Sequence, residues 1–211
     1  MRNYFKIVVY LFALTCFSSA SADDKVSFFR ALGIDNVSTV NSLLAAGFDP
    51  NTLDEKGQAA LYVALREEAP KVVKALLAHP GLKADYTNAA GETPLMMAAM
   101  RGNIEAAVDL IDKGAAINRP GWTPLHYAAS SPHTAMVRLL LGKGAAIEAV
   151  SPNKTTPLMM ASRYGSEEVA GLLLAGGASA RARNDQALGA ADFARLAGRE
   201  ALARRLDEAA R

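Results

Sequence analysis

The chain has 211 residues, of which 51% are hydrophobic and 21% are charged, and its formal net charge at pH 7 is +2. This composition predicts a folded chain with a sizeable core and excludes the disordered and collagen-like classes. The small net charge also argues against a general binder of nucleic acids or anionic membranes, which would carry a basic excess.

Residues 1–22 have the pattern of a secretory signal peptide. Arg2 and Lys6 precede an apolar run over residues 7–17, and a small-residue cleavage site ends at Ala22. The run is shorter than the roughly 20 apolar residues of a membrane-spanning helix. We therefore expect cleavage after Ala22, with an uncleaved membrane anchor as the alternative. Cys16 lies within this segment, but the residues before it fit a lipoprotein signal poorly.

Removal of this segment would leave a mature chain of balanced charge without a thiol. Taking Arg2 and Lys6 from the 23 basic residues leaves 21, which equals the 21 acidic residues. The only cysteine would be removed as well, so neither disulfide nor thiol chemistry is expected. We expect a bacterial periplasmic protein with no nucleic-acid partner and no stable membrane insertion after cleavage.

The rest of the chain consists of copies of one helix–turn–helix unit, clearest over residues 91–118. Thr93 is a hydroxyl N-cap, and Pro94 occupies the first helical position, where its missing N–H costs nothing. Gly102 ends the first helix, Asn103 caps the second, and Gly114 ends it. Each helix has about eight to ten residues and is too short to be stable alone. The unit therefore needs neighbours.

Similar units recur along the chain at a nearly constant spacing. The triplet Thr-Pro-Leu begins copies at Thr123 and Thr156, which are 33 residues apart. A weaker copy places Leu61 34 residues before Leu95, and another begins at Gly189. A fixed period of this size is typical of a repeat solenoid.

The pattern TPLHYAA, followed by a second helix and GAAIN, resembles the ankyrin repeat from residue 28 to the C-terminus. With the signal segment, the chain is similar to secreted or periplasmic bacterial ankyrin-repeat proteins. The resemblance implies an all-α solenoid of stacked helix–turn–helix units with projecting hairpin loops, or fingers. It also implies a concave face that binds a protein partner. The predicted parts are an N-terminal capping repeat (23–51), repeats at 52–85, 86–118, 119–148 and 149–180, and a C-terminal capping repeat (181–211).

The finger of repeat 119–148 is three residues shorter than its neighbours. Trp122, the only tryptophan, stands at its end, at the position of Gln58, Glu92 and Thr155 in other repeats. In the ankyrin family this position points to the concave side. A tryptophan there is a candidate binding anchor. Alternatively, Trp122 folds down to fill the space left by the missing residues.

The ends of the first helices supply further candidates, because they line the concave groove in the family. Cationic and aromatic groups there would form a patch of the kind that dominates interfaces. The alternative is an ordinary solvated helix end. The candidate protein-binding residues are Trp122, Arg101, Met100, Arg163, Tyr164, Glu92 and Thr155.

No sequence motif indicates catalysis. The chain lacks HExxH, GxSxG, GxGxxG, the phosphate-binding glycine loop and CxxC. His126 fills the histidine place of the ankyrin TPLH pattern, whose role in the family is structural. We therefore expect no enzyme activity, cofactor or metal. The predicted function is that of a monomeric, non-catalytic periplasmic protein that binds one protein partner to stabilise or organise it. The alternatives are an immunity protein that neutralises a toxic effector enzyme, and an exported host-directed effector.

Overall fold

The computed structural model describes residues 22–211. The predicted signal segment lies outside the described residues, apart from Ala22. The described chain forms two compact units, residues 22–82 and 83–211. The division falls within the loop that joins α4 to α5, shortly after Pro80.

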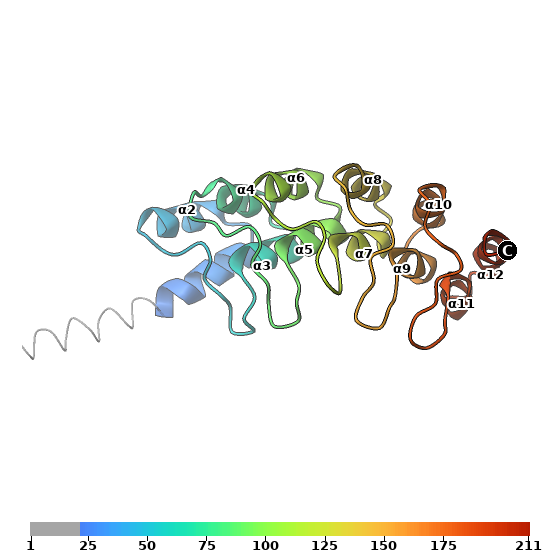
Figure 1. Cartoon of the computed structure of the whole chain (residues 1–211). Helices are drawn as coiled ribbons and strands as arrows, with labels where there is room; N and C mark the ends of the chain where they lie inside the picture. Colours follow the sequence, from blue (N-terminus) through green and yellow to red (C-terminus); the bar gives the residue numbers. More distant parts are fainter. Residues whose placement is uncertain (1–21) are drawn as a thin grey trace, which may run out of the picture. The chain divides into compact units, whose positions relative to one another are not determined.

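Both units are built from short helices (Figure 1). In the first unit, residues 22–33 are helical and are followed by α2 (Val37–Ala45), α3 (Ala60–Arg66) and α4 (Pro70–Ala78). In the second unit the helices are α5 (Pro94–Arg101), α6 (Ile104–Asp112), α7 (Pro124–Ala129), α8 (Thr134–Gly142), α9 (Pro157–Arg163), α10 (Glu167–Ala175), α11 (Ala190–Leu196) and α12 (Glu200–Ala209). Residues 22–211 contain no strand, only an isolated β-bridge between Leu53 and Ala59. The predicted all-α array of helix pairs is confirmed.

The predicted helix ends of the clearest repeat are also confirmed. The Oγ1 atom of Thr93 accepts a hydrogen bond from the backbone N–H of Met96 at the start of α5. Gly102 ends α5 with a φ of 66°, in the left-handed region that favours glycine. The Asn103 side chain accepts a hydrogen bond from Ala106 N–H and so caps α6. Local capping chemistry therefore sets these boundaries.

In the first unit, one repeat caps a helix of the next. Ala69 precedes α4 and provides no side-chain cap. The carboxylate of Asp35 accepts a hydrogen bond from Val72 N–H in the first turn of α4, at 3.0 Å.

The N-terminal end of the unit is closed by Phe28, which is fully buried with its ring centroid 4.6 Å from that of Phe48.

In the second unit, the first helices α5, α7, α9 and α11 lie in one row, and α6, α8 and α10 lie in another (Figure 1). In each of the helices α5 to α10, one leucine is at most 1% exposed and forms part of the core. Each such side chain contributes about 2 kcal/mol through burial. These core leucines are Leu95, Leu125 and Leu158 in first helices and Leu110, Leu140 and Leu173 in second helices.

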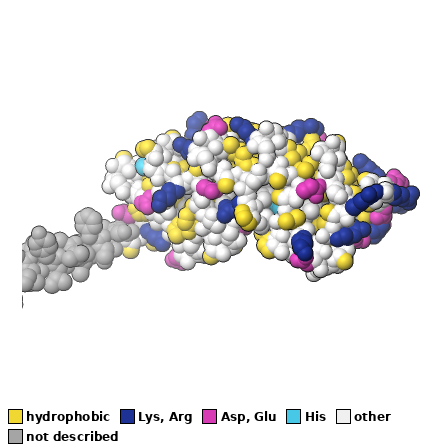
Figure 2. Space-filling view, in the orientation of Figure 1, with side chains coloured by type: hydrophobic (Ala, Val, Ile, Leu, Met, Phe, Trp, Pro, Cys, Tyr) yellow, Lys and Arg dark blue, Asp and Glu magenta, His cyan; other side chains and the backbone are white. Residues whose placement is uncertain are grey.

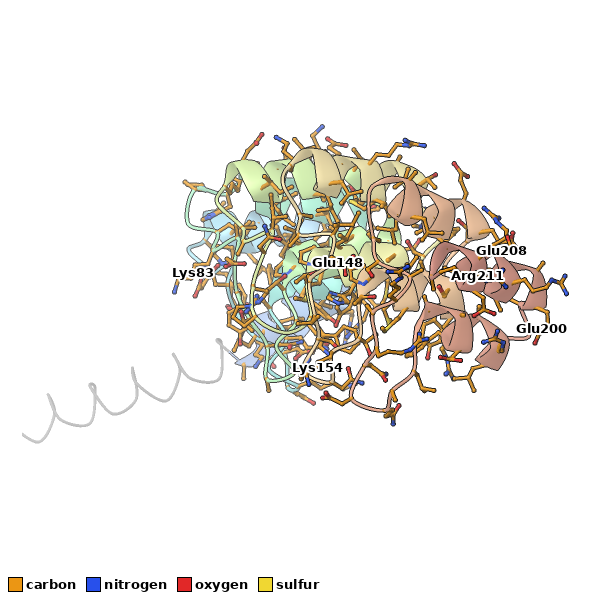
Figure 3. The ribbon with its side chains drawn as sticks, turned by 45° about the vertical axis from the view of Figure 1, so that its right-hand side comes forward. Lys83, Glu148, Lys154, Glu200, Glu208 and Arg211 are labelled. Carbon is orange, nitrogen blue, oxygen red and sulfur yellow. The ribbon has the colours of Figure 1, made fainter. Side chains whose placement is uncertain are left out.

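The fingers of the second unit share one turn. Asn88 N–H donates to the carbonyl oxygen of Glu92 at 3.0 Å, and the Asn88 side chain accepts from Glu92 N–H at 2.9 Å. Ser151 and Asn184 begin the same turn in later repeats. Figure 3 labels Lys154, which lies in the finger that Ser151 begins and forms an ion pair with Asp185 of the next finger at 2.7 Å.

The finger ending at Trp122 departs from this turn because it is shorter. Figure 1 shows that its loop ends before the tips of the loops on either side. Arg119 reaches across to the preceding finger, where its Nη2 atom donates to Thr87 Oγ1 at 3.1 Å. This shortening brings Trp122 close to the helix ends.

Candidate functional site

A hollow of about 280 Å³ lies in the second unit where the ends of α5, α7 and α9 meet two finger loops. We call it the tryptophan hollow. Its lining residues are Glu92, Met100, Trp122, His126, Tyr127, Ser130 and Met160.

The repeat geometry brings these side chains together. Helix α7 packs against both α5 and α9, so residues at equivalent places in successive repeats become neighbours. Tyr127 and Met160 both stand four residues after the capping threonine of their helix. Met100 comes from the last turn of α5 and is 38% exposed. The hollow is therefore built from three helices and two finger loops of successive repeats.

The Trp122 ring has two roles in the structure. It lies edge-on to the ring of His126, with the centroids 5.2 Å apart and an interplanar angle of 77°. The side chain is only half-buried, and it also lines the hollow. The ring therefore packs below the shortened finger and leaves part of its surface at the hollow, while its role as a binding anchor stays a prediction.

Glu92 fixes the opposite wall of the hollow. One carboxylate oxygen, Oε1, accepts a hydrogen bond from the Tyr127 hydroxyl at 3.0 Å. The other, Oε2, accepts a hydrogen bond from the Asn88 side-chain amide at 2.9 Å. Both aromatic side chains are therefore held in place before any partner arrives, so little ordering entropy is lost on binding.

His126 forms the floor of the hollow and is fully buried. Its Nδ1 atom accepts a hydrogen bond from the backbone N–H of Thr123 at 3.2 Å. The proton therefore resides on Nε2, which donates to the carbonyl oxygen of Thr155 at 3.0 Å. Burial lowers the pKa of His126 below its ordinary value of 6.5, against the opposing effect of hydrogen bonds to the Thr155 and Ala149 carbonyls. Both ring nitrogens are occupied, as the expected structural role requires.

Thr155 is a correction to the candidate list. Its side chain is only 2% exposed, and its backbone N–H donates to Ser151 Oγ at 3.0 Å. The same turn that closes the finger buries the residue, so Thr155 offers no surface to a partner. Thr155 instead contributes its carbonyl oxygen, which accepts a hydrogen bond from the Nε2–H group of His126.

The structure divides the other candidates. Glu92, Met100 and Trp122 meet at the hollow, whereas Arg101, Arg163 and Tyr164 do not line it. The Arg163 guanidinium instead lies 5.3 Å from the centroid of the Tyr164 ring, which is 58% exposed. Arg101 is exposed at the end of α5. The role of these residues in binding stays a prediction.

Four lining residues, His126, Tyr127, Ser130 and Met160, are not among the candidate binding residues, although Ser130 stands at the end of a first helix, where the groove was expected. The sequence contains a signal for two of them, because Tyr127 and Met160 occupy the same place in their repeats as the buried Met97. Only the packing of α7 against α9 shows that this place opens into a hollow beside the short finger.

The chemistry of the hollow suits noncovalent contact. Two aromatic rings and two thioethers can bury an apolar surface, and thioethers adapt to its shape. Within residues 22–211, no group of three His, Cys, Asp or Glu side chains is placed to hold a metal ion. None of the helices described is long and apolar enough to cross a membrane.

Comparison with known proteins identifies the repeats. A family model for ankyrin repeats (3 copies) matches residues 28–120 and 109–184. The chain is 30% identical over 156 residues to the nuclear factor NF-kappa-B p105 subunit of Gallus gallus, covering 71% of this chain and 16% of that protein. It is 31% identical over 152 residues to the B-cell lymphoma 3 protein homolog of Mus musculus, covering 69% and 34%. The chain thus spans 16% and 34% of the length of these relatives, and both are eukaryotic proteins.

Proposed function

Because this chain belongs to the ankyrin-repeat family, we propose that it is a non-catalytic module that binds one protein partner at the tryptophan hollow. The observation that supports this proposal most directly is the preformed aromatic wall. The Trp122 ring rests on the buried His126, and the Tyr127 hydroxyl is held by Glu92. Tryptophan, tyrosine and methionine are over-represented at protein interfaces, and the first two dominate binding energies.

The volume of the hollow supports one inserted side chain as the central contact. About 280 Å³ accommodates a single large apolar or amphipathic side chain, with the thioethers of Met100 and Met160 adapting to its shape. The half-buried Arg163 and the exposed Tyr164 would contribute at the periphery of the interface, where charged contacts add less energy.

We also propose the periplasm as the site of action and a resident periplasmic protein as the partner that is stabilised or organised. This part of the proposal depends on the signal-like residues 1–22 alone. Survival of the partner's activity in the complex would favour organisation, whereas its loss would favour neutralisation of a toxic effector. The mature N-terminus, measured by mass spectrometry, tests the export step.

The binding proposal is tested by affinity capture from a periplasmic extract, followed by titration of the captured protein. Trp122→Ala should weaken binding by at least about 30-fold, the effect of losing an interface hot spot. Tyr164→Ala is the matched comparison and should weaken binding much less, because it removes an exposed aromatic ring at the periphery, outside the hollow. Circular dichroism must show both variants folded. Equal affinity of Trp122→Ala and the unmodified chain would rule out the hollow as the contact.

A further inference from the structure

Helices α8 and α10, the second helices of two neighbouring repeats, carry more half-exposed leucines than the second helices α6 and α12. The core leucines of α6, α8, α10 and α12 are all fully buried. In α6 the residue before the core leucine is Asp109, and in α12 it is Arg205. In α8 and α10 the core leucine is instead flanked on both sides by leucines that are only partly buried: Leu139, Leu141, Leu172 and Leu174.

These flanking leucines border a second depression, which we call the leucine hollow. It has a volume of about 480 Å³ and lies between α8 and α10, lined by Arg138, Leu141, Leu172, Ala175 and Gly176. Figure 2 shows hydrophobic side chains gathered over the row of second helices, with Lys and Arg side chains at its border. Contiguous apolar surface of this kind marks interaction sites.

The charge at the edge of the leucine hollow is positive. Arg138 is the only charged residue among those lining it, and it is exposed and forms no ion pair within residues 22–211. Two cations nearby are matched, since Lys143, directly after α8, lies 3.8 Å from Asp112, and Arg205 of α12 lies 3.6 Å from Glu167. An apolar depression with one available guanidinium therefore favours an apolar group accompanied by a carboxylate.

We propose that the leucine hollow binds an amphipathic helix of a protein partner. A leucine-type side chain of that helix inserts between Leu141 and Leu172, and an Asp or Glu one turn away forms an ion pair with Arg138. On a helix, residues three and four apart lie on one face, which matches an apolar contact beside a charged one. This surface lies on the second helices, whereas the tryptophan hollow lies on the first helices, and the two proposals are independent.

The probe is a stapled amphipathic peptide with leucines at i, i+3 and i+7 and glutamates at i+4 and i+8. Its twin carries lysines in place of the glutamates. Each is titrated into isotope-labelled protein purified from cells that express the full chain, and backbone amide shifts are recorded by NMR. The glutamate peptide should shift amides of α8 and α10 and bind at least about tenfold more tightly than the lysine peptide.

Two substitutions test the contacts of Arg138 and Leu172. Each introduces the residue that another second helix has at the equivalent position. Leu172→Arg introduces the residue that α12 has at this place, Arg205, and should abolish binding of both peptides. Arg138→Val introduces the residue that α6 has, Val108, and should retain the apolar contact while removing the preference for glutamate. Trp122→Ala should leave the titration unchanged.

Several outcomes would overturn the proposal. These are amide shifts away from α8 and α10, equal affinity for the two peptides, and unchanged binding by folded Leu172→Arg. Self-association of the chain that Leu172→Arg abolishes, without binding of the glutamate peptide, would identify a second copy as the occupant.

Discussion

The Nε2 atom of His126 lies 3.0 Å from the carbonyl oxygen of Thr155, so the imidazole joins the repeat at 119–148 to the one at 149–180. In the next repeat Met159 occupies the equivalent place, where its sulfur accepts a hydrogen bond from Thr156 N–H at 3.4 Å. A thioether has no proton to donate. Of these two side chains, His126 alone therefore also donates a hydrogen bond to the following finger. His126 therefore makes the stability of the stack sensitive to pH.

We expect the free energy of unfolding to fall as the pH is lowered from 7.5 to 5. The folded pKa of His126 is lowered by burial, whereas the unfolded chain binds a proton near the ordinary value of 6.5. Below that pH the unfolded state binds more protons than the folded state, so acid favours unfolding. The contribution of His126 is present above 6.5 and is lost progressively as the pH falls from 6.5 through the lowered folded pKa. Urea titrations at several pH values measure this effect.

The control for the pH effect is His126→Met, which copies the next repeat. It should lower stability at pH 7.5 by about 1 to 3 kcal/mol, because the buried Thr155 carbonyl loses its donor. It should also flatten the pH dependence of the free energy of unfolding between 7.5 and 5, because the His126 imidazole is gone. His79 and His133 are present in both chains, so the difference between them reports on His126 alone. A pH dependence as steep as that of the unmodified chain would contradict our assignment to His126.

Arg199→Met should destabilise the C-terminal repeat. The Nη1 atom of Arg199 lies 3.0 Å from the carbonyl oxygens of Ala161 and Ser162 and 2.9 Å from that of Gly165. A cation at the C-terminal end of α9 satisfies carbonyls that the helix leaves free. We expect a loss of about 1.5 to 3 kcal/mol in urea unfolding. Arg204→Met is the control on the exposed side of α12, and equal losses for the two variants would refute the capping role.

Ala187→Gly should stabilise the chain. Ala187 has a φ of 60°, and Gly91 occupies the equivalent place of an earlier finger with a φ of 80°. A side chain in this left-handed conformation costs about 1 kcal/mol, so removing it should raise the free energy of unfolding by about that amount. The reciprocal change, Gly91→Ala, should lower it similarly, because nothing within 4 Å would meet the new methyl group. Denaturant unfolding of both variants gives the comparison, and changes of the same sign would contradict the argument.

Gly165→Ala should be among the most damaging single substitutions. A Cβ atom at this position would lie 2.2 Å from the backbone carbonyl oxygen of Ala129 in the preceding repeat. Backbone must move to relieve such a contact, and we expect a loss of at least about 2 kcal/mol. Gly142→Ala is the matched control, because its Cβ would meet nothing within 4 Å at the end of α8. Thermal unfolding should separate the two variants clearly, and similar midpoints would be inconsistent with a close approach at Gly165.

The sequence predicts those features that local chemistry decides. Helices begin at Pro94, Pro124 and Pro157 as expected, because a threonine cap and a proline act within one turn. The burial of His126 likewise follows from its place in a recognised motif.

Features that depend on contacts between repeats are not predicted. The burial of Thr155 follows from a finger turn that the sequence does not reveal. Tyr127 and Met160 border a hollow only because α7 packs against α9 beside a shortened loop. The contact of Arg199 with Gly165 spans 34 residues along the chain. Unlike His126, whose place a family motif indicates, Arg199 has no signature in its own repeat, so its partner carbonyls emerge only from the structure.

Trp122→Ala should cost about 1 to 2 kcal/mol of stability, less than the 3 to 5 kcal/mol typical of a fully buried tryptophan. The ring is half-buried, and its edge-on contact with His126 is lost in the variant. Trp122→Phe should retain most of this energy, because a phenyl ring can keep the contact. A loss below about 0.5 kcal/mol in urea unfolding of Trp122→Ala would show that the ring does not support the fold.

Because Trp122 is the only tryptophan of the chain, its fluorescence reports directly on the hollow. Partner binding there should shift the emission to shorter wavelength as water leaves the ring, and a bound partner that leaves the emission unchanged would have to contact the chain elsewhere.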